Sequence, residues 1–252
     1  MVQEASDRMH RHKTGDSTSS PTSLITFFDF ERAYDKVWRE GLLHKMIKMK
    51  IPYAFVKYVR HFLSARRTKV EVNKVKSNTF YMNEGLPQGS SISPILFLIF
   101  INDILDDVDA SPSLFADDTA VWIATGKNKE DATRQMQKNI TAIEKWAQKW
   151  KMSLNKGKTE AMVISTDAAD LEWKPRLRLK GQEIKIVKDY KFLGVTLDGG
   201  LRFNLHVNRV IAKCKKRIGI LKCLRGKDWG QGLEEQRLLY LLYIISALEY
   251  AD

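Results

Sequence analysis

Runs of apolar residues along the first third of the chain alternate between strand-like and helix-like spacing. Residues 24–30 (LITFFDF) form a continuous apolar and aromatic run, which predicts a buried strand that ends on Asp29. Residues 33–47 place apolar side chains at helical spacing and predict a helix. Pro52 marks the start of a second helix, whose apolar face carries Phe55, Val56, Val59 and Phe62.

The middle of the chain changes to short strand signals and a loop rich in Gly, Pro and Ser. Residues 68–82 alternate like a pair of strands, and residues 85–94 (GLPQGSSISP) have the composition of a loop. The apolar stretch that follows, up to Leu105, predicts a buried helix. Residues 113–124 then predict a β-hairpin whose turn falls at two adjacent aspartates, Asp117 and Asp118.

The second half of the chain combines one long helix with several strands before it becomes helical again. Residues 130–151 place apolar side chains at steps of three and four and predict an amphipathic helix. Gly181 and Gln182 predict a hairpin turn, and the pattern is helical from Leu201 onward. Strand signals occupy residues 160–165, 177–180, 184–187 and 192–197. The pattern as a whole predicts an α+β fold.

The composition of the chain indicates which class of partner it binds. The chain has 252 residues, 44% of them hydrophobic, which suits one large domain or one domain with a satellite. Its 42 Lys and Arg against 30 Asp and Glu give a net charge of +12, which favours a polyanionic partner, nucleic acid ahead of an acidic membrane.

Sequence features bearing on location point to the interior of the cell. The first 20 residues are polar and carry no signal peptide, and the longest apolar runs, residues 95–101 and 238–248, are too short to span a bilayer. Cys214 and Cys223 have no His or Cys at ligand spacing, which argues against a disulfide framework or a zinc site and fits a reducing compartment. We expect an intracellular protein of the nucleus, the cytoplasm or both, without a membrane partner.

Three aspartates form the candidate chemistry. Asp29 ends one predicted strand, and Asp117 and Asp118 lie at the turn of a hairpin. If these strands are neighbours in one sheet, the carboxylates converge at its edge, where a divalent cation would relieve their repulsion. Mg²⁺ prefers such oxygen ligands, and two Mg²⁺ ions suit phosphoryl transfer. An isolated Asp-Asp pair is more often a solvated turn, so spacing alone leaves both interpretations open.

Five sequence blocks change the balance between those interpretations. They follow one another in the order FFDFERAYDKVW (27–38), GLPQGSSISPILFLIFINDI (85–104), FADD (115–118), MSLNKGKTE (152–160) and YKFLGV (190–195). In this order and spacing they resemble the reverse transcriptases of non-LTR (LINE-type) retrotransposons, over roughly residues 24–250. The resemblance implies a right-hand polymerase fold: a palm over residues 24–198, with a three- or four-stranded antiparallel sheet backed by helices. A partial helical thumb would follow over residues 199–252, and residues 1–23 would be a partly disordered N-terminal segment.

The resemblance implies roles for residues around the aspartates. Asp29, Asp117 and Asp118 match the metal-binding triad of the family, which holds two Mg²⁺ ions, with Mn²⁺ as an alternative. The backbone carbonyl of Phe30 would add a ligand. Tyr34 matches the aromatic gate that rejects the 2′-hydroxyl of a ribonucleotide, although a tyrosine that only packs in the core fits the pattern as well.

Further positions match parts of the family that contact the nucleotide and the primer. Gln88 matches a residue that contacts the incoming nucleotide, and Gly89 would permit a close backbone approach. Lys158 lies where the family has a lysine near the pyrophosphate leaving group, with Lys156 as an alternative. The primer grip, a hairpin that holds the primer 3′ end, would consist of Phe192, Leu193 and Gly194, for which a plain β-turn with a packed Phe is the alternative.

A basic segment near the C-terminal end supports nucleic-acid binding without the resemblance. Residues 201–227 contain nine Lys and Arg and no Asp or Glu. On a helix, an apolar stripe would anchor this segment to the core; the stripe comprises Val207, Val210, Ile211, Cys214, Ile218 and Leu221. A basic face would contact the phosphate backbone; it comprises Arg209, Lys213, Lys216 and Arg217. A solvated helix face is the alternative. In the family this region is the thumb, which holds the template–primer duplex.

The resemblance therefore implies an RNA-directed DNA polymerase that transfers nucleotides from dNTP to a primer 3′-hydroxyl, with an RNA template and a DNA primer. Only 28 residues precede Asp29, and none of them forms the family's fingers block; endonuclease and RNase H regions are not matched either. A catalytically inactive retrotransposon remnant and a non-catalytic nucleic-acid-binding protein remain alternatives. A palm-type nucleotide cyclase is disfavoured, because it would need neither the primer-grip block nor the basic helix.

Overall fold

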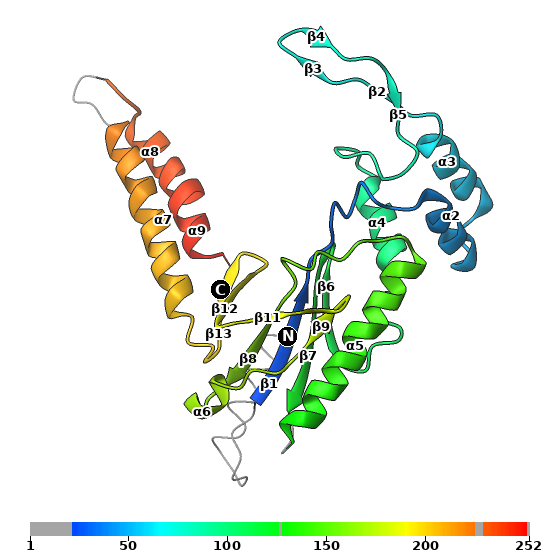
Figure 1. Ribbon diagram of the computed structural model, residues 1–252. Helices are drawn as coiled ribbons and strands as arrows, with labels where there is room; N and C mark the ends of the chain where they lie inside the picture. Colours follow the sequence, from blue (N-terminus) through cyan, green and yellow to red (C-terminus); the bar gives the residue numbers. More distant parts are fainter. Residues whose placement is uncertain (1–21, 126–127, 225–228, 251–252) are drawn as a thin grey trace. The chain divides into compact units, whose positions relative to one another are not determined.

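The chain folds into two compact units that divide after Val187 (Figure 1). The structure, a computed structural model, describes residues 22–125, 128–224 and 229–250. The first unit contains a sheet and most of the helices, and the second begins at Lys188 with a hairpin and continues as helices. The hairpin that the sequence assigned to the palm thus groups with the helices that follow it, and the division at residue 198 stays a prediction.

A five-stranded sheet lies at the centre of the first unit, in the order β11-β8-β1-β7-β6. The central strand β1 (Thr22–Phe28) is buried along its whole length and pairs antiparallel with β7 (Asp118–Thr125) and β8 (Glu160–Ser165). The edge strand β6 (Ser111–Phe115) is antiparallel to β7, whereas β11 (Lys185–Val187) is parallel to β8. The expected antiparallel sheet is thus present as the four strands β8, β1, β7 and β6, and the expectation missed only that β11 adds a fifth strand in parallel at one edge.

The hairpin β6–β7 confirms the turn expected at the aspartates. Phe115 pairs with Asp118, so that Ala116 and Asp117 form a two-residue turn. Ala116 has a φ of +52°, in the left-handed region that tight hairpin turns use. The helix expected after this hairpin is also confirmed as α5 (Lys129–Lys149), which packs against β7 and β1 (Figure 1). Asn128 caps it by accepting hydrogen bonds from the backbone N–H groups of Glu130 and Asp131.

Three helices pack together beyond the end of the sheet. They are α2 (Arg39–Lys48), α3 (Tyr53–Leu63) and α4 (Ser93–Ile101). The start of α3 directly after Pro52 agrees with the sequence, although Phe55 of its expected apolar face is 40% exposed. The helix expected over 33–47 begins only at Arg39, because residues 31–36 form turns. The carbonyls of Tyr34 and Val37 accept hydrogen bonds from Leu86 and Gly85, so this backbone bonds to a distant loop instead of continuing a helix.

A buried lysine joins these helices to α5. Lys45 of α2 is only 4% exposed, and its ammonium donates to the Phe100 carbonyl of α4 at 2.6 Å. It also pairs with Asp103, which accepts a second hydrogen bond, 2.7 Å long, from the indole N–H of Trp146. The ammonium lies 3.8 Å from the ring centroid of Trp150 and 4.7 Å from that of Trp146. Lys45 therefore connects three helices through its polar end.

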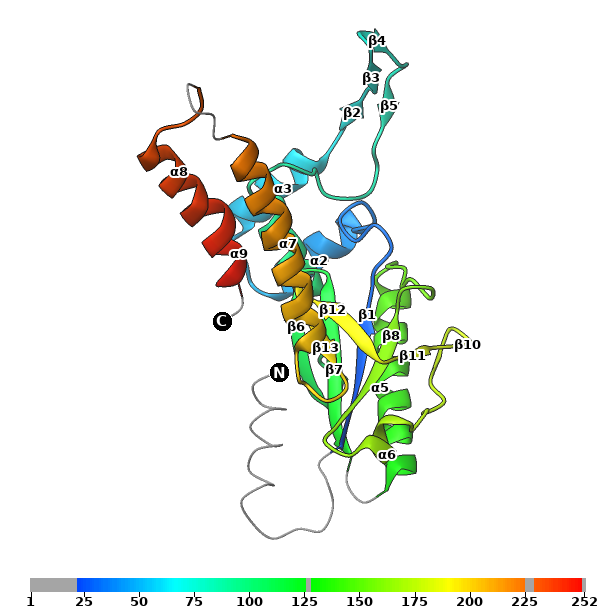
Figure 2. The same ribbon diagram turned by 90° about the vertical axis from the view of Figure 1, so that its left-hand side faces the viewer.

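Residues 64–84 form a narrow two-stranded ribbon that projects from the helices (Figure 2). Near its base β2 (Arg67–Thr68) pairs with β5 (Phe80–Tyr81), and at its tip β3 (Glu71–Val72) pairs with β4 (Val75–Lys76). The strand pair expected over 68–82 is thus confirmed as two short ladders.

Smaller elements complete the first unit. A four-residue helix, α6 (Ala168–Leu171), follows β8. The strands β9 (Arg178–Leu179) and β10 (Gln182–Glu183) then form a small hairpin. Its turn consists of Lys180 and Gly181, one residue earlier than the expected turn at Gly181 and Gln182.

The second unit begins with the hairpin of β12 (Asp189–Phe192) and β13 (Val195–Asp198). The long helix α7 (Asn204–Cys223) packs against β13 and against the C-terminal helices. These are α8 (Leu233–Tyr240), the π-helical segment η1 (Leu241–Ile245) and α9 (Ser246–Leu248). Among the described residues, no helix is both long and apolar enough to cross a membrane.

Half of the apolar stripe expected to anchor α7 is exposed. Val207 is 50%, Ile211 42% and Ile218 37% exposed, whereas Cys214 is buried and Val210 and Leu221 are partly buried. Val210 lies on the side of α7 that borders the hairpin and the C-terminal helices, and Lys213 and Arg217 share that side. The expected stripe therefore anchors this helix only in part.

Candidate functional site

The three aspartates gather at the end of the sheet where β1 ends and β7 begins. Phe28 pairs with Thr119, so Asp29 follows β1 opposite Asp118 in the antiparallel register, and Asp117 lies in the adjoining turn. Burial, and then the negative charges of Asp117 and Asp29, raise the pKa of the Asp118 carboxyl. The carboxylates are therefore within electrostatic reach of one another, as the sequence predicted from neighbouring strands.

Asp29 is held by a short bridge to the segment before β8. The N–H of Asn155 donates to the Asp29 carbonyl at 2.8 Å, and the N–H of Glu31 donates to the Ser153 carbonyl at 2.8 Å. Between them Phe30 faces Leu154 in an isolated antiparallel bridge. The hydrogen bonds of this bridge are made by the backbone groups of Asp29 and Glu31, on either side of Phe30. The bridge therefore does not use the carbonyl of Phe30. The Phe30 side chain is buried, with its ring edge-on to another aromatic ring of the core.

Tyr34 lies between the aspartate turn and helix α4. Its ring stacks on Phe97 with centroids 4.6 Å apart and an interplanar angle of 17°. Burial, and then the charge of Asp117, raise the pKa of its phenol. The side chain is half-buried, so one part packs on the core while another stays accessible beside the carboxylates. Both interpretations of Tyr34, a gate and a packing residue, fit this position.

The loop that carries Gln88 is fastened to the turn after β1. The Leu86 N–H donates to the Tyr34 carbonyl at 2.8 Å, and the exposed Gln88 amide donates to a carboxylate oxygen of Asp35 at 3.0 Å. Gly89 has a φ of +82°, and a Cβ there would meet no atom within 4 Å. Its backbone conformation requires glycine, and the space above it is open. The structure thus brings Gln88 and Gly89 next to Tyr34.

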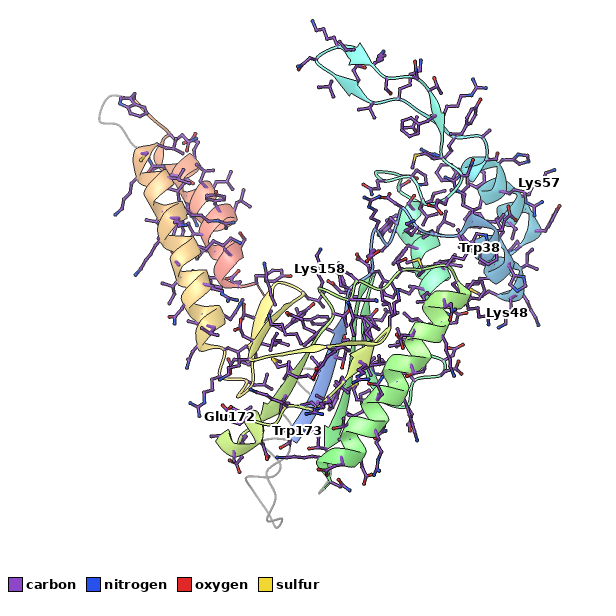
Figure 3. All side chains as sticks on the ribbon, in the orientation of Figure 1. Trp38, Lys48, Lys57, Lys158, Glu172 and Trp173 are labelled. Atoms are coloured by element: carbon purple, nitrogen blue, oxygen red, sulfur yellow. The ribbon has the colours of Figure 1, made fainter. Side chains whose placement is uncertain are left out.

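Lys158 precedes β8, at the same end of the sheet as the aspartates (Figure 3). The register places Glu160 opposite Phe27, two residues before Asp29. Lys158 and its alternative Lys156 are both exposed and belong to one turn, so their positions do not decide between them. Asn155 shapes this turn, since its side-chain oxygen accepts from the Gly157 N–H at 3.0 Å.

Arg39 is a residue of this region that the sequence did not single out. Its guanidinium donates to four backbone carbonyls: Gly85 at 2.8 Å, Leu63 at 2.8 Å, Met82 at 2.6 Å and Glu84 at 2.9 Å. These carbonyls come from the end of α3 and from the chain that returns from the ribbon to the Gln88 loop. One side chain therefore closes the base of the ribbon and fixes the start of that loop.

Gly85 completes the same junction. It has a φ of +80°, and a Cβ there would lie 2.5 Å from the Asp35 carbonyl oxygen. Its N–H donates to the Val37 carbonyl at 2.9 Å. Only glycine permits this close passage of two backbones. The Gly-Leu-Pro-Gln-Gly pattern marks a loop, but nothing local in the sequence says which backbone the loop crosses.

We expect Arg39→Met to lower the free energy of unfolding by about 2–3 kcal/mol, because it removes the donors of four carbonyls at once. Arg39→Lys keeps the charge but cannot reproduce the fork of donors, so it should recover only part of the loss. Urea unfolding measures the change, and limited proteolysis should show faster cleavage within residues 64–90. Equal proteolysis of all three proteins would contradict this role of Arg39.

In the second unit, the residues matched to the primer grip form the tip of a tight hairpin. Phe192 is buried, and it pairs with Val195 across a two-residue turn of Leu193 and Gly194, with φ of +46° and +87°. The Tyr250 hydroxyl donates to the Leu193 carbonyl at 2.9 Å. A Cβ on Gly194 would lie 2.7 Å from the Tyr250 ring. Tyr250, which the sequence did not suggest, thus fastens this turn to the C-terminal helices.

The four basic residues expected on one face of α7 differ in their surroundings. Arg209 donates to the Thr196 hydroxyl at 2.7 Å and pairs with Asp189 at 3.4 Å. Arg217 donates to the Tyr243 carbonyl at 2.5 Å and lies 4.3 Å from the centroid of its ring. For Lys213 and Lys216, the structure of the described residues contains no such partner.

The donor set around the aspartates suits a hard divalent cation in its chemistry. Carboxylate and carbonyl oxygens are the ligands that Mg²⁺ prefers, and the mutual repulsion at Asp118 is what a cation relieves. Within residues 22–125, 128–224 and 229–250, however, no three His, Cys, Asp or Glu side chains converge as a ready-made metal site. The carboxylates therefore lie near one another without being arranged as ligands.

Comparisons with known proteins identify the family to which the chain is similar. A family model described as reverse transcriptase (RNA-dependent DNA polymerase) matches residues 3–197. The RNA-directed DNA polymerase from mobile element jockey of Drosophila melanogaster is 31% identical over 206 residues, which are 79% of this chain and 22% of that protein. The probable RNA-directed DNA polymerase from transposon BS of the same species is 28% identical over 223 residues, 85% of this chain and 24% of that protein.

A solved structure supports the fold. Apo telomerase from Candida tropicalis superposes with a TM-score of 0.54 at 14% identity, covering 79% of this chain and 33% of the telomerase chain. The chain spans about a fifth to a quarter of the length of the jockey and BS relatives. The family model nevertheless covers most of the chain, and with the ordered blocks around Asp29, Gln88 and Asp117 it leads to one assignment. The chain belongs to the reverse transcriptase family, and its relatives are the RNA-directed DNA polymerases of non-LTR retrotransposons.

Proposed function

We propose that this chain is the catalytic part of an RNA-directed DNA polymerase that copies RNA into DNA during retrotransposition. The observation that carries the proposal is the meeting of Asp29, Asp117 and Asp118 at one end of the sheet, with Tyr34 beside them. A solvated Asp-Asp turn would need neither the third carboxylate nor the neighbouring half-buried phenol. In this proposal residues 24–198 are the palm and residues 199–252 part of the thumb.

The aspartates would hold two divalent cations, Mg²⁺ or Mn²⁺, with the Phe30 carbonyl as a further ligand. When bound, such cations stabilise the attacking and the leaving oxygen of a phosphoryl transfer. The carboxylates of this chain orient the reacting groups at the sheet end, and either Lys158 or Lys156 supplies positive charge toward the leaving pyrophosphate.

The residues around Tyr34 would select and position the nucleotide. The phenol is held in place by the Phe97 ring, so it would form a firm wall beneath the sugar and reject a ribose 2′-hydroxyl. Gln88 lies on a loop fastened to the Tyr34 backbone, and it would contact the incoming dNTP, with Gly89 leaving room for a close approach. Asp35 keeps the Gln88 amide in one orientation.

The second unit would hold nucleic acid. The turn of Phe192, Leu193 and Gly194 would grip the 3′ end of the DNA primer. The basic residues of α7, Arg209, Lys213, Lys216 and Arg217, would contact the backbone of the RNA–DNA duplex, with the two lysines free to bind phosphate. We place the protein inside the cell, where its free thiols, the buried Cys214 and the exposed Cys223, stay reduced.

Primer extension on an RNA template with Mg²⁺ tests the proposal. We expect the full chain to add dNTP to the primer and Asp117→Asn to lose this synthesis while duplex binding survives. The matched control is Asp107→Asn, because Asp107 is an exposed carboxylate away from the sheet end. This variant should retain synthesis. Synthesis that persists in Asp117→Asn would refute the role of the triad. Salt-sensitive binding without synthesis by the unsubstituted chain would instead favour a non-catalytic nucleic-acid-binding protein or an inactive remnant.

A further inference from the structure

A cavity of about 480 Å³ lies within the second unit, between the hairpin tip and the helices. We call it the basic cavity. Lys191, Gly194 and Thr196 of the hairpin form one wall, and a stripe of α7 that begins at His206 forms another. Tyr250 and neighbouring residues of α9 close the third side. All of its lining residues belong to one unit, so the cavity exists independently of how the two units are arranged.

Among the described residues, the lining carries positive charge and no acidic side chain. Its described cations are Lys191, Arg209, Lys213 and Arg217. Lys216, on the basic face expected from the sequence, is not among the lining residues. Asp189 forms an ion pair with one of these cations, Arg209, at 3.4 Å. Of the four residues on the basic face of α7, Arg209, Lys213 and Arg217 thus line the cavity, and Lys216 does not.

The two arginines and the two lysines have different tasks in this cavity. Arg209 is bonded to Thr196 and Asp189, and Arg217 to Tyr243, so both arginines help to hold the walls together. For Lys191 and Lys213, the described part of the chain provides no carboxylate within ion-pair distance. Two ammonium groups, one from a strand and one from a helix, therefore lack a counterion and border the same cavity.

The walls are fixed before any ligand arrives. The Thr196 N–H donates to Nδ1 of His206 at 3.2 Å, which ties the hairpin to the first turn of α7. Arg209 joins the same hairpin strand to α7, and the Tyr250 hydroxyl holds the hairpin tip at 2.9 Å. Such cross-links lower the ordering cost of binding an anion.

The size and lining of the cavity favour a nucleic-acid strand over a free ion. Its volume lies in the range of sites that hold small organic molecules, so an inorganic anion alone would leave it mostly unfilled. Part of the lining is apolar, including Val210, Ala247 and the ring of Tyr250, which suits sugar carbons beside a charged phosphate. We propose that the basic cavity seats a single backbone phosphate of a bound nucleic-acid strand, held jointly by Lys191 and Lys213. This inference rests on the proposed function, because it assumes a nucleic-acid ligand.

One shared phosphate predicts a distinctive salt dependence. Each phosphate neutralised by a protein contributes about 0.9 to the slope of log K against log salt for duplex DNA. If both lysines hold the same phosphate, Lys191→Ala/Lys213→Ala should lower the slope by about one. Two separate phosphates would lower it by about two. The two single variants should each weaken binding, and their combined effect should be less than the product of the separate effects.

The experiment measures binding of the full chain to a labelled RNA–DNA duplex between 50 and 200 mM salt. We expect Lys191→Ala/Lys213→Ala to weaken binding at least tenfold. The matched control, Lys215→Ala/Lys222→Ala, removes two exposed charges of α7 outside the cavity and should weaken binding less than threefold. Circular dichroism verifies that both variants are folded. Equal losses in the two variants, or a slope change near two, would overturn the single-phosphate cavity.

Lysine acetylation followed by mass spectrometry distinguishes the source of the phosphate in the unsubstituted chain. The duplex should slow acetylation of Lys191 and Lys213 relative to Lys215. Inorganic phosphate at equal ionic strength should not. Protection by inorganic phosphate alone would identify a free-anion site and overturn the strand assignment. Absence of duplex binding by the unsubstituted chain would overturn both this inference and the proposed function. Normal binding by Lys191→Ala/Lys213→Ala would overturn the cavity alone.

Discussion

Lys45→Ala is expected to lower the free energy of unfolding by about 3–5 kcal/mol, the range seen when one partner of a buried ion pair is removed. The ammonium holds the Phe100 carbonyl, pairs with Asp103 and lies over the rings of Trp146 and Trp150. Alanine would leave a space among these rings and remove a partner from Asp103. Lys45→Met fills the space and keeps the Trp146 hydrogen bond to Asp103, so its loss should be smaller, about 1–2 kcal/mol. Urea unfolding at pH 7 compares the three proteins.

The same lysine should make stability depend on pH in alkaline solution. Burial lowers the pKa of Lys45 from its ordinary 10.5 to about 8, despite the opposing effect of Asp103. Between about pH 8 and 10.5 the unfolded chain therefore binds more protons than the folded chain, and the free energy of unfolding contributed by this group rises with pH. The slope can reach about 1.4 kcal/mol per pH unit. Below pH 8 this contribution is lost.

Lys45→Met supplies the control for this pH dependence, because it keeps all other titrating groups. Subtracting its unfolding curve from that of the unsubstituted chain should leave a rise between pH 8 and 10.5. A difference that stays constant from pH 7 to 11 would show that Lys45 releases its proton at the same pH in the folded and the unfolded chain.

Asp118→Asn is expected to abolish DNA synthesis and, in metal-free buffer, to stabilise the fold. The two effects have one cause. Burial and the charges of Asp117 and Asp29 disfavour the ionised Asp118 carboxyl in the folded chain, so a neutral amide removes repulsion. The same carboxylate is needed if the site binds divalent cations, so the variant should lose synthesis. Melting temperatures in EDTA and primer extension in Mg²⁺ measure the two effects.

Mg²⁺ should reverse the order of stability. At ten times its dissociation constant, a ligand that binds only the folded chain stabilises it by about 1.4 kcal/mol. The unsubstituted chain should therefore melt at a higher temperature in Mg²⁺ than in EDTA, and Asp118→Asn should respond much less. Asp107→Asn serves again as the control and should respond like the unsubstituted chain. An equal response of all three proteins would mean that Mg²⁺ stabilises the chain elsewhere.

Elements with a local signal were predicted correctly from the sequence. The strand at 24–30, the helix after Pro52, the hairpin at the aspartates and the helix over 130–151 each appear at nearly the expected residues. Their periodicity is a property of 7 to 22 neighbouring residues, so a short stretch of sequence is enough to indicate each of them. The position of Asp29 near Asp117 and Asp118 at one end of the sheet was also predictable, because it follows once the two strands are neighbours.

Elements whose form depends on distant partners were predicted incorrectly. The turn at 31–36 replaces the first part of an expected helix because its carbonyls bond to Leu86 and Gly85, some fifty residues later. The stripe on α7 has correct helical spacing, yet spacing does not state which part of it meets other elements: Val210 borders the cavity beside Lys213, whereas Val207 and Ile211 are exposed. The parallel pairing of β11 with β8 likewise depends on the path of the intervening chain.

The sequence by itself determined the family of this protein, the order of its elements and the residue types of its candidate site, because motifs and periodicity are written along the chain. Only the tertiary structure decided which side chains support that site. Arg39 joins four carbonyls from two segments, Lys45 joins three helices, and Lys191 and Lys213 line one cavity. These residues lie 22 to 105 positions apart in the chain, where neither spacing nor composition carries a signal, and only packing brings them together.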